Sequence, residues 1–133
     1  LRLTQRFGGL VALRIRIGTV NAWAILDTAA THSIGNEYLR KALGIHRDFD
    51  PSRDAVIADV AAGTLPAIVA ATPVMTLGKR QIAGAPLRFA ALPLFERWGW
   101  QRQSAILLGL DRLTNLGRLR INYTKSQLLL PSD

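Results

Sequence analysis

Short strand-like segments separated by turn residues run through almost the whole chain. Apolar and basic side chains alternate over the second half of residues 10–17, and residues 22–26 are apolar. Residues 18–21 form a turn that joins these two segments as a hairpin. Further strands are predicted at 55–59, 64–69, 74–77, 81–82, 87–92, 105–108, 118–123 and 127–130. Many short strands at regular spacing indicate an all-β fold whose sheet closes, or nearly closes, on itself.

Two segments favour short helices instead of strands. Residues 33–43 are predicted to form a helix that Ser33 caps and Gly44 ends. Residues 111–116 are predicted to form the second helix, with Asp111 as its N-cap. Two of the remaining connections are predicted to be a polar surface loop at 48–54 and an aromatic loop at 95–100.

The chain has 133 residues, of which 49% are apolar, and this is enough for one domain, residues 1–133, with its own core. It has no cysteine, which excludes disulfides, thiolate metal sites and a cysteine nucleophile. Its two histidines, His32 and His46, are too few for a histidine-rich metal site. No apolar run approaches the ~20 residues that a membrane-spanning helix needs.

The formal net charge of +8 is spread along the chain rather than concentrated. Arg14 and Arg16 alternate with apolar residues, and so do Arg118 and Arg120. Alternation with a period of two places such charges on the solvent face of a half-buried strand. We therefore favour a solvated surface over a nucleic-acid-binding patch, although a basic protein can attract nucleic acid or an acidic partner.

One apolar segment ends on a single carboxylate. Residues 23–26 lead directly into Asp27, and the hydroxyl of Thr28 and the small residues Ala29 and Ala30 follow. This arrangement presents Asp27 on a tight loop at the end of a buried strand, where a carboxylate can act as a general base. The alternative interpretation is that Asp27 and Thr28 only start a turn or cap a helix.

A second apolar segment, 105–108, ends in Gly109 and leads into the predicted helix 111–116. With these two motifs the chain resembles the retropepsin-like aspartic proteases of retroviruses, retrotransposons and bacteria. That family has an apolar strand ending in Asp-Thr/Ser-Gly-Ala and later an apolar strand ending in Gly, then a short helix and a final strand. Residues 31–33, Thr-His-Ser, are similar to the continuation in retrotransposon members. The resemblance implies a retropepsin-like fold, a closed or partly open β-barrel, over about residues 10–130.

The resemblance also implies an aspartic endopeptidase, whose chemistry needs two close carboxylates that share one proton. Because this chain offers Asp27 alone, the second carboxylate would come from another copy in a homodimer or from a homologous lobe. Thr28 would hydrogen-bond across the dimer beneath the two carboxylates. Ala29 departs from the family, which has glycine there, while Ala30 completes the loop against the substrate. No metal or organic cofactor is implied.

The predicted strands 55–59 and 64–69 flank a segment of small residues, Ala61, Ala62 and Gly63. Because this segment lies between the two motifs, we interpret it as the tip of a flap that opens and closes over a bound peptide. The alternative interpretation is a plain exposed hairpin. Pro66 cannot donate to a sheet ladder, so its strand should lie at an edge or project from the sheet.

Three hypotheses for function follow. The first is an aspartic endopeptidase acting on peptide or protein substrates as a homodimer or paired lobes. The second is a catalytically impaired peptide-binding or dimerisation domain of the same fold, which Ala29 favours. The third is a basic nucleic-acid-binding β-barrel, which would need aromatic and basic residues interleaved on one face. We expect no nucleic-acid partner, and we expect the chain to be part of a longer protein that acts outside the cytoplasm, in a bacterial periplasm.

Overall fold

The computed structural model of the protein describes residues 5–7, 10–59, 63–117, 120–122, 125 and 127–129. Strands dominate these residues and short helices and turns connect them. The strands are β1 (Gln5–Phe7), β2 (Leu10–Ile17), β3 (Val20–Leu26), β4 (Ile34–Gly35), β5 (Ala55–Asp59), β6 (Gly63–Ala70), β7 (Met75–Leu77), β8 (Arg80–Ile82), β9 (Leu87–Phe89), β10 (Ala105–Leu108), β11 (Arg120–Asn122) and β12 (Gln127–Leu129). The helices are α1 (Glu37–Ala42), α2 (Pro93–Arg97), α3 (Leu110–Leu113) and the 3-10 turn η1 (Thr114–Leu116).

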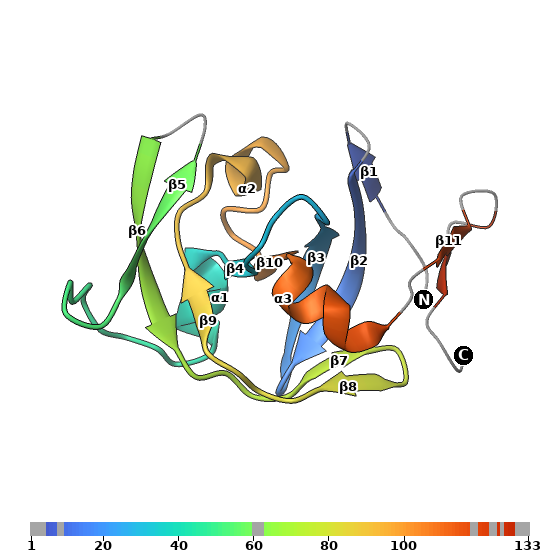
Figure 1. Ribbon diagram of the computed structural model, residues 1–133, viewed down its shortest axis with the longest axis horizontal. Helices are drawn as coiled ribbons and strands as arrows, with labels where there is room; N and C mark the ends of the chain where they lie inside the picture. Colours follow the sequence, from blue (N-terminus) through green and yellow to red (C-terminus); the bar gives the residue numbers. More distant parts are fainter. Residues whose placement is uncertain are drawn as a thin grey trace.

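Ten of the described strands form one sheet in the order β5-β6-β9-β4-β10-β3-β2-β7-β8, with β1 pairing β2 beside this path. β11 and β12 pair with each other in a separate sheet. Figure 1 shows the large sheet as a curved layer, with the β5–β6 hairpin standing at one end and the β7–β8 hairpin along the lower edge. The predicted all-β fold is confirmed, and the sheet is open rather than closed.

The two apolar motifs lie side by side at the centre of this sheet. β3 and β10 pair in parallel, with Leu26 opposite Leu108 at their carboxyl ends. β4 pairs antiparallel to β10 on its other side, so β10 is an interior strand. The parallel pairing brings the residues that follow the two strands, Asp27 and Gly109, to the same edge of the sheet.

Two apolar clusters cover the two faces of these central strands. Alternate residues of β3 and β10 enter different clusters: Leu26 and Leu108 pack into one, whereas Ile25 and Leu107 pack into the other. A strand that is buried on both faces needs an unbroken apolar sequence rather than an alternating one. This explains why residues 105–108 are all apolar and all buried.

Helix α1 is shorter than predicted and has a different cap. It begins after Asn36, whose side-chain oxygen accepts a hydrogen bond from the Leu39 amide, so the prediction that Ser33 is the N-cap is wrong. Ser33 instead lies directly before β4. Gly44 ends the helical segment as predicted, with a φ of +78° and its amide bonded to the Lys41 carbonyl oxygen.

Helix α2 replaces the first half of the predicted aromatic loop, residues 95–97. Pro93 begins it, in the first turn where proline is tolerated, and Trp98 caps its carboxyl end. Phe95 and Trp100 are buried in the core cluster that also holds Ile25. The aromatic residues therefore fix this helix against the sheet, which is a tertiary effect that the local sequence pattern does not reveal.

The β5–β6 hairpin projects beyond the rest of the sheet. β6 pairs with β5 from Gly63 to Ala67, but it pairs with β9 only from Ile68 onward. Pro66 therefore lies in the half of β6 that has a single neighbour, in agreement with the prediction of a projecting strand. None of the described helices has the length and apolar character needed to cross a membrane.

Candidate active site

Asp27 lies in a tight turn at the carboxyl end of β3. Its amide donates to the Leu108 carbonyl oxygen at 2.9 Å, which continues the parallel pairing by one residue. Its carboxylate oxygen Oδ1 accepts from the Ala29 amide at 3.0 Å, and its carbonyl oxygen accepts from the Ala30 amide at 3.2 Å. Asp27 thus does start a turn, and that turn leaves the half-buried carboxylate with one oxygen, Oδ2, free of any described hydrogen bond.

The loop after Asp27 packs against Gly109 with no room for a side chain. A Cβ at Gly109 would lie 2.7 Å from the Ala30 carbonyl oxygen and 2.8 Å from the His32 carbonyl group. The same loop accepts hydrogen bonds from the start of α3: the Leu110 amide donates to Ala30 at 2.8 Å, and the Asp111 amide donates to the Thr31 carbonyl at 3.1 Å. Glycine is required here because two backbone segments approach closely.

A second link joins the two motifs through side chains. The Ser33 hydroxyl donates to Asp111 Oδ1 at 2.6 Å, and the Ser33 amide donates to the same oxygen at 3.0 Å. The Gly109 amide in turn donates to the Ser33 hydroxyl oxygen at 2.9 Å. Because Gly109 occupies the N-cap position of α3, the prediction that Asp111 is the N-cap is wrong. Ser33 and Asp111 are 78 residues apart, so no local pattern could have paired them.

Arg112 continues this network away from the site. Its guanidinium donates to the Pro86 carbonyl oxygen at 2.8 Å and to the Ala85 carbonyl oxygen at 3.3 Å, and it contacts Asp111 Oδ2 at 3.3 Å. The residue is buried, so these acceptors compensate for the loss of water around its charge. Arg112 therefore ties α3 to the segment that leads into β9.

Asn36 is a further positioning residue that the sequence analysis missed. Its side-chain oxygen accepts from the amides of Leu39 and Ala105, at 2.8 and 3.1 Å. Its side-chain nitrogen donates to the carbonyl oxygens of Trp100 and Gln103, at 3.0 and 2.7 Å. Two donors and two acceptor positions are thus all used, which fixes the start of β10 relative to α1.

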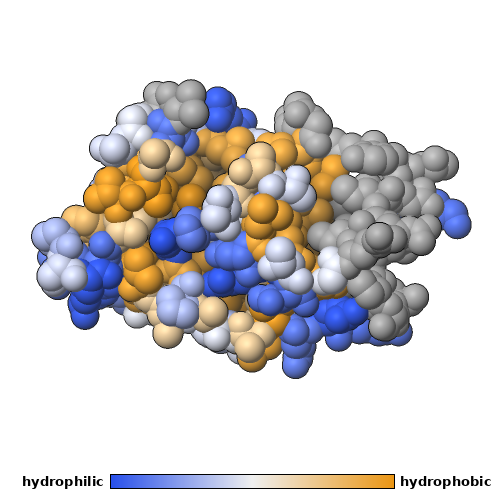
Figure 2. All heavy atoms as spheres, viewed as in Figure 1, coloured by the Kyte–Doolittle hydropathy of each residue, from blue (hydrophilic) through white to orange (hydrophobic). Residues whose placement is uncertain are grey.

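A groove of about 600 Å³ lies beside Asp27. β5 contributes four consecutive residues to its wall, so the projecting hairpin borders the groove along its length. Figure 2 shows apolar residues over the β5–β6 hairpin and over the neighbouring region of α2 on this face of the molecule. The lining residues are mostly apolar, with three basic and two acidic side chains among them: Leu10, Asp27, Ala30, Thr31, His32, Ile34, Val56, Ile57, Ala58, Asp59, Arg88, Leu92, Leu94, Arg97 and Leu107.

An ion pair anchors the base of the hairpin. Two nitrogens of Arg47 each donate to a different carboxylate oxygen of Asp54 at 2.6 Å, and the Asp54 side chain is 0% exposed. The same carboxylate accepts from the amides of Val69 on β6 and of Asp50, at 2.9 and 2.8 Å. The hydrogen bonds from Arg47 hold the pKa of Asp54 well below its usual range, and those to Asp54 raise the pKa of Arg47.

Solved structures of two proteases and of one protease-like domain resemble this chain in fold. A retropepsin-like aspartic protease from Rickettsia conorii superposes with a TM-score of 0.61 at 17% identity, covering 98% of this chain and 88% of its own. The retroviral protease-like domain of Ddi1 from Leishmania major gives 0.62 at 18% identity, covering 93% and 90%. EIAV protease, in complex with the inhibitor HBY-793, gives 0.61 at 19% identity, covering 90% and 99%.

The chain has the retropepsin-like fold. The resemblance deduced from the two motifs is thereby confirmed at the level of the fold. No protein-family model matches the sequence. No curated protein matches it either.

The structure places the predicted site residues of this retropepsin-like chain as follows. Asp27 and Ala30 line the groove, whereas Thr28 and Ala29 are exposed beside it. Gly63 is exposed at the start of β6 with a φ of +79°, a backbone conformation that favours glycine. The predicted flap-tip residues Ala61 and Ala62 lie outside the described residues.

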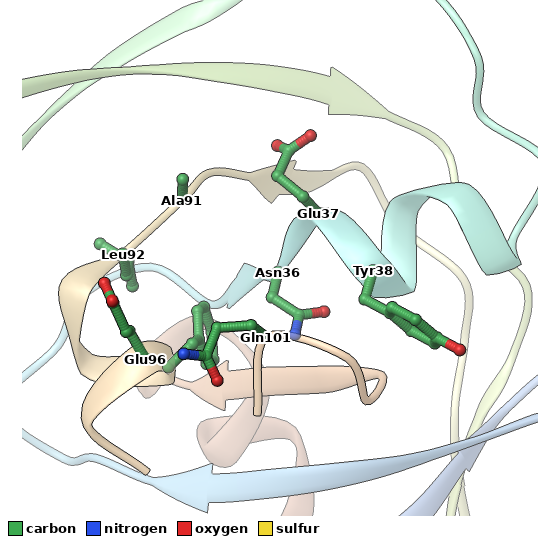
Figure 3. A pocket seen from close by; sticks show the side chains of 8 residues that line it. Asn36, Glu37, Tyr38, Ala91, Leu92, Glu96 and Gln101 are labelled. Carbon is green, nitrogen blue, oxygen red and sulfur yellow. The ribbon is translucent and has the colours of Figure 1, made fainter. Parts of the chain in front are cut away.

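A smaller pocket of about 170 Å³ lies between α1 and α2. Figure 3 shows Glu37 and Tyr38 from the start of α1 and Glu96 and Gln101 on the other side, with Tyr38 pointing away from them. Glu37 is already paired with Arg40 at 2.6 Å. The pocket does not include Asp27, and it shares the lining residue Leu92 with the candidate catalytic groove.

Proposed function

We propose that the protein is an aspartic endopeptidase that hydrolyses a peptide bound in the groove beside Asp27. One observation supports this most strongly. Asp27 is a half-buried carboxylate in a turn at the end of a central strand, on the wall of a groove that a projecting hairpin borders. The fold adds support, because two of the solved structures that it resembles are the aspartic protease from Rickettsia conorii and EIAV protease.

The chemistry requires a second carboxylate that one copy of the chain does not supply from its described residues. Asp59 is the other acidic residue of the groove, but it belongs to the hairpin and has an interaction of its own. Asp111 is engaged by Ser33 and Arg112. We therefore propose that the partner carboxylate is Asp27 of a second copy, because a two-fold axis brings a residue opposite its own equivalent.

In this mechanism the two carboxylates share one proton and hold a water molecule between them. The ionised carboxylate takes a proton from the water as it attacks the peptide carbonyl carbon, and the protonated one donates to the carbonyl oxygen. The tetrahedral intermediate then breaks its C–N bond: the carboxyl that took the proton from water donates it to the amine nitrogen, and a hydroxyl group of the intermediate returns its proton to the other carboxylate, so that the pair again shares one proton. The hydrogen bond from the Ala29 amide to Asp27 Oδ1 would hold the carboxylate in orientation throughout.

The exposed neighbours of Asp27 fit roles at a subunit interface. Thr28 is exposed in the single chain, and we assign its hydroxyl a hydrogen bond to the partner copy beneath the carboxylates. Ala29 is exposed at the position where the family has glycine, and its methyl group would narrow the space shared by the partner and the peptide. We assign the tip of the β5–β6 hairpin, with Gly63 at its edge, the role of a flap.

A catalytically impaired peptide-binding or dimerisation domain is the second candidate function, and Ala29 is the observation that favours it. The nucleic-acid alternative gains no support from the aromatic segment, because Trp98 and Trp100 are buried rather than available for stacking.

The test is cleavage of an unstructured protein by the wild type and by Asp27→Asn. We expect the wild type to cleave and the variant to lose cleavage while it keeps its thermal unfolding transition. Asp48→Asn is the matched control, since Asp48 is an exposed carboxylate outside the groove. Equal activity in wild type and Asp27→Asn would refute the assignment. If neither protein cleaves but both bind peptide, the impaired binding domain is the better account.

A further inference from the structure

The groove beside Asp27 has two arginines with no described partner. Arg88 enters from β9 and Arg97 from the end of α2, and both line the same groove. Neither guanidinium has a hydrogen bond or an ion pair with any residue that the structure describes. Their guanidinium groups can therefore form ion pairs with a ligand bound in the groove.

Several arginines elsewhere in the described chain differ in this respect. Each has a carboxylate, a carbonyl oxygen or an aromatic ring against its guanidinium: Arg14 over Trp23, Arg40 with Glu37, Arg47 with Asp54, Arg53 with Asp50, and Arg112 with Pro86. Arg16 and Arg102 are exposed without a described partner, but they lie outside the groove. Among the arginines whose side chains the structure describes, Arg88 and Arg97 are the two that lack a described partner and also line the groove.

The acidic groups nearby do not neutralise these two arginines. Arg88 also lines an adjoining pocket of about 150 Å³ with Asp111, whose carboxylate already accepts from Ser33 and contacts Arg112. The carboxylates of the groove itself are Asp27, which the proposed chemistry uses, and Asp59, which has an interaction of its own.

We infer that this groove selects peptides that carry an acidic side chain beside the apolar residues flanking the cleaved bond. A guanidinium pairs with a carboxylate through two parallel hydrogen bonds, which gives orientation as well as attraction. The apolar wall supplied by Ile34, Leu92 and Leu107 would take the neighbouring apolar side chains. The net charge of +8 favours the approach of an acidic peptide. The inference rests on the proposed function, because it takes the groove as the peptide-binding site.

Binding to the Asp27→Asn protein tests this inference without depending on catalysis. The probes are fluorescent peptides with an apolar core, in which one residue on either side of the core is in turn Glu, Gln or Lys. We expect the best Glu peptide to bind about two- to fivefold more tightly than its Gln counterpart, as for a partly exposed ion pair, with the Lys peptide weakest. The preference should weaken at high salt.

Variants identify the arginines responsible. Arg97→Gln and Arg88→Gln should each reduce the preference for Glu over Gln, and the double variant should abolish it. Arg97→Glu should turn the preference towards the Lys peptide, which a merely structural role would not do. Arg102→Gln is the matched control, since it removes an exposed arginine outside the groove and should leave the preference unchanged.

The outcomes separate this inference from the proposed function. Equal binding of Glu and Gln peptides, no binding of any peptide, or a preference that survives in the double variant would overturn the inference. If the wild type cleaves peptides without regard to acidic residues, proteolysis stands and the acidic preference is wrong. If the Glu peptide binds best but no peptide is cleaved by the wild type, the acidic preference stands and proteolysis is wrong.

Discussion

A Cβ at Gly109, the residue between β10 and α3, would lie 2.7 Å from the carbonyl oxygen of Ala30, which is three residues after Asp27. The contact joins the loop that presents Asp27 to the end of the central strand β10. The same oxygen accepts the Leu110 amide at 2.8 Å. The position of Asp27 in the groove therefore depends on a glycine far away in the sequence.

Replacing this glycine tests that dependence. Gly109→Ala places a methyl group against two backbone carbonyls, so it should destabilise the protein by about 1–3 kcal/mol, the usual cost of overpacking. It should also lower cleavage, because the Asp27 loop must move. Gly44→Asn is the control, since nothing lies within 4 Å of a Cβ there and asparagine tolerates its positive φ. Chemical denaturation measures the stability, and an unchanged midpoint for Gly109→Ala would contradict the packing described here.

The Ser33 hydroxyl provides a second test of the support beneath the site. Ser33→Ala leaves a part-buried Asp111 carboxylate and the Gly109 amide without this partner, which should cost about 1–3 kcal/mol of unfolding free energy. Ser52→Ala removes a comparable hydroxyl–carboxylate bond to Asp50, at 2.7 Å but exposed, and should change stability by less than about 0.5 kcal/mol. A similar loss of unfolding free energy in the two variants would show that the buried hydrogen bonds of Ser33 stabilise the protein no more than an exposed one does.

The sequence predicted the central elements well because their signals are local. Residues 10–17 and 105–108 form β2 and β10 with the predicted bounds, and Asp27 and Gly109 follow their strands as expected. The cap of α1 could not be predicted from its sequence neighbours alone. The Asn36 side chain is held at the cap position by hydrogen bonds with Trp100, Gln103 and Ala105, which form only in the folded chain.

The supporting network of the candidate site was also hidden from the sequence. Ser33 and Asp111 each have a familiar local use as helix caps, and that use competes with the long-range bond that the fold makes between them. The two unpartnered arginines of the groove gave no signal either, since Arg88 lies in a strand and Arg97 ends a helix that was predicted as a loop.

The hairpin anchor has a predictable pH dependence. The pKa of Asp54 is lowered in the folded protein, so its ion pair with Arg47 stabilises the fold fully above the unfolded pKa of about 4. That contribution is lost only as the pH falls further, towards the lower folded pKa. The difference in unfolding free energy between wild type and Asp54→Asn should therefore stay constant from neutral pH to about pH 4 and shrink below it.

Asp48→Asn is the control for this pH series, because Asp48 is exposed and the ion pair of Arg47 with Asp54 stays in place in that variant. The amide of Val69, which donates to Asp54, should exchange its hydrogen faster in Asp54→Asn. A difference that grows on acidification would contradict the lowered pKa of Asp54.

Ala29 separates the two leading functions. If its methyl group only narrows the cleft, Ala29→Gly should raise the rate of peptide cleavage, because glycine restores the space that the family has there. The measurement is cleavage of a fluorogenic peptide at equal protein concentrations. A wild type and a glycine variant that are both inert, yet both bind the peptide, would favour a binding or dimerisation domain.

The central claim is that cleavage needs two Asp27 carboxylates from two associated copies. The most direct measurement is the specific activity of the wild type over a dilution series, with the oligomeric state followed by sedimentation and an inert excess of Asp27→Asn added in a parallel series. We predict that specific activity falls in proportion to concentration once the dimer dissociates, and that the added variant suppresses it by forming hybrid pairs. A demonstrably monomeric sample that cleaves with a constant specific activity, unaffected by Asp27→Asn, would contradict the account.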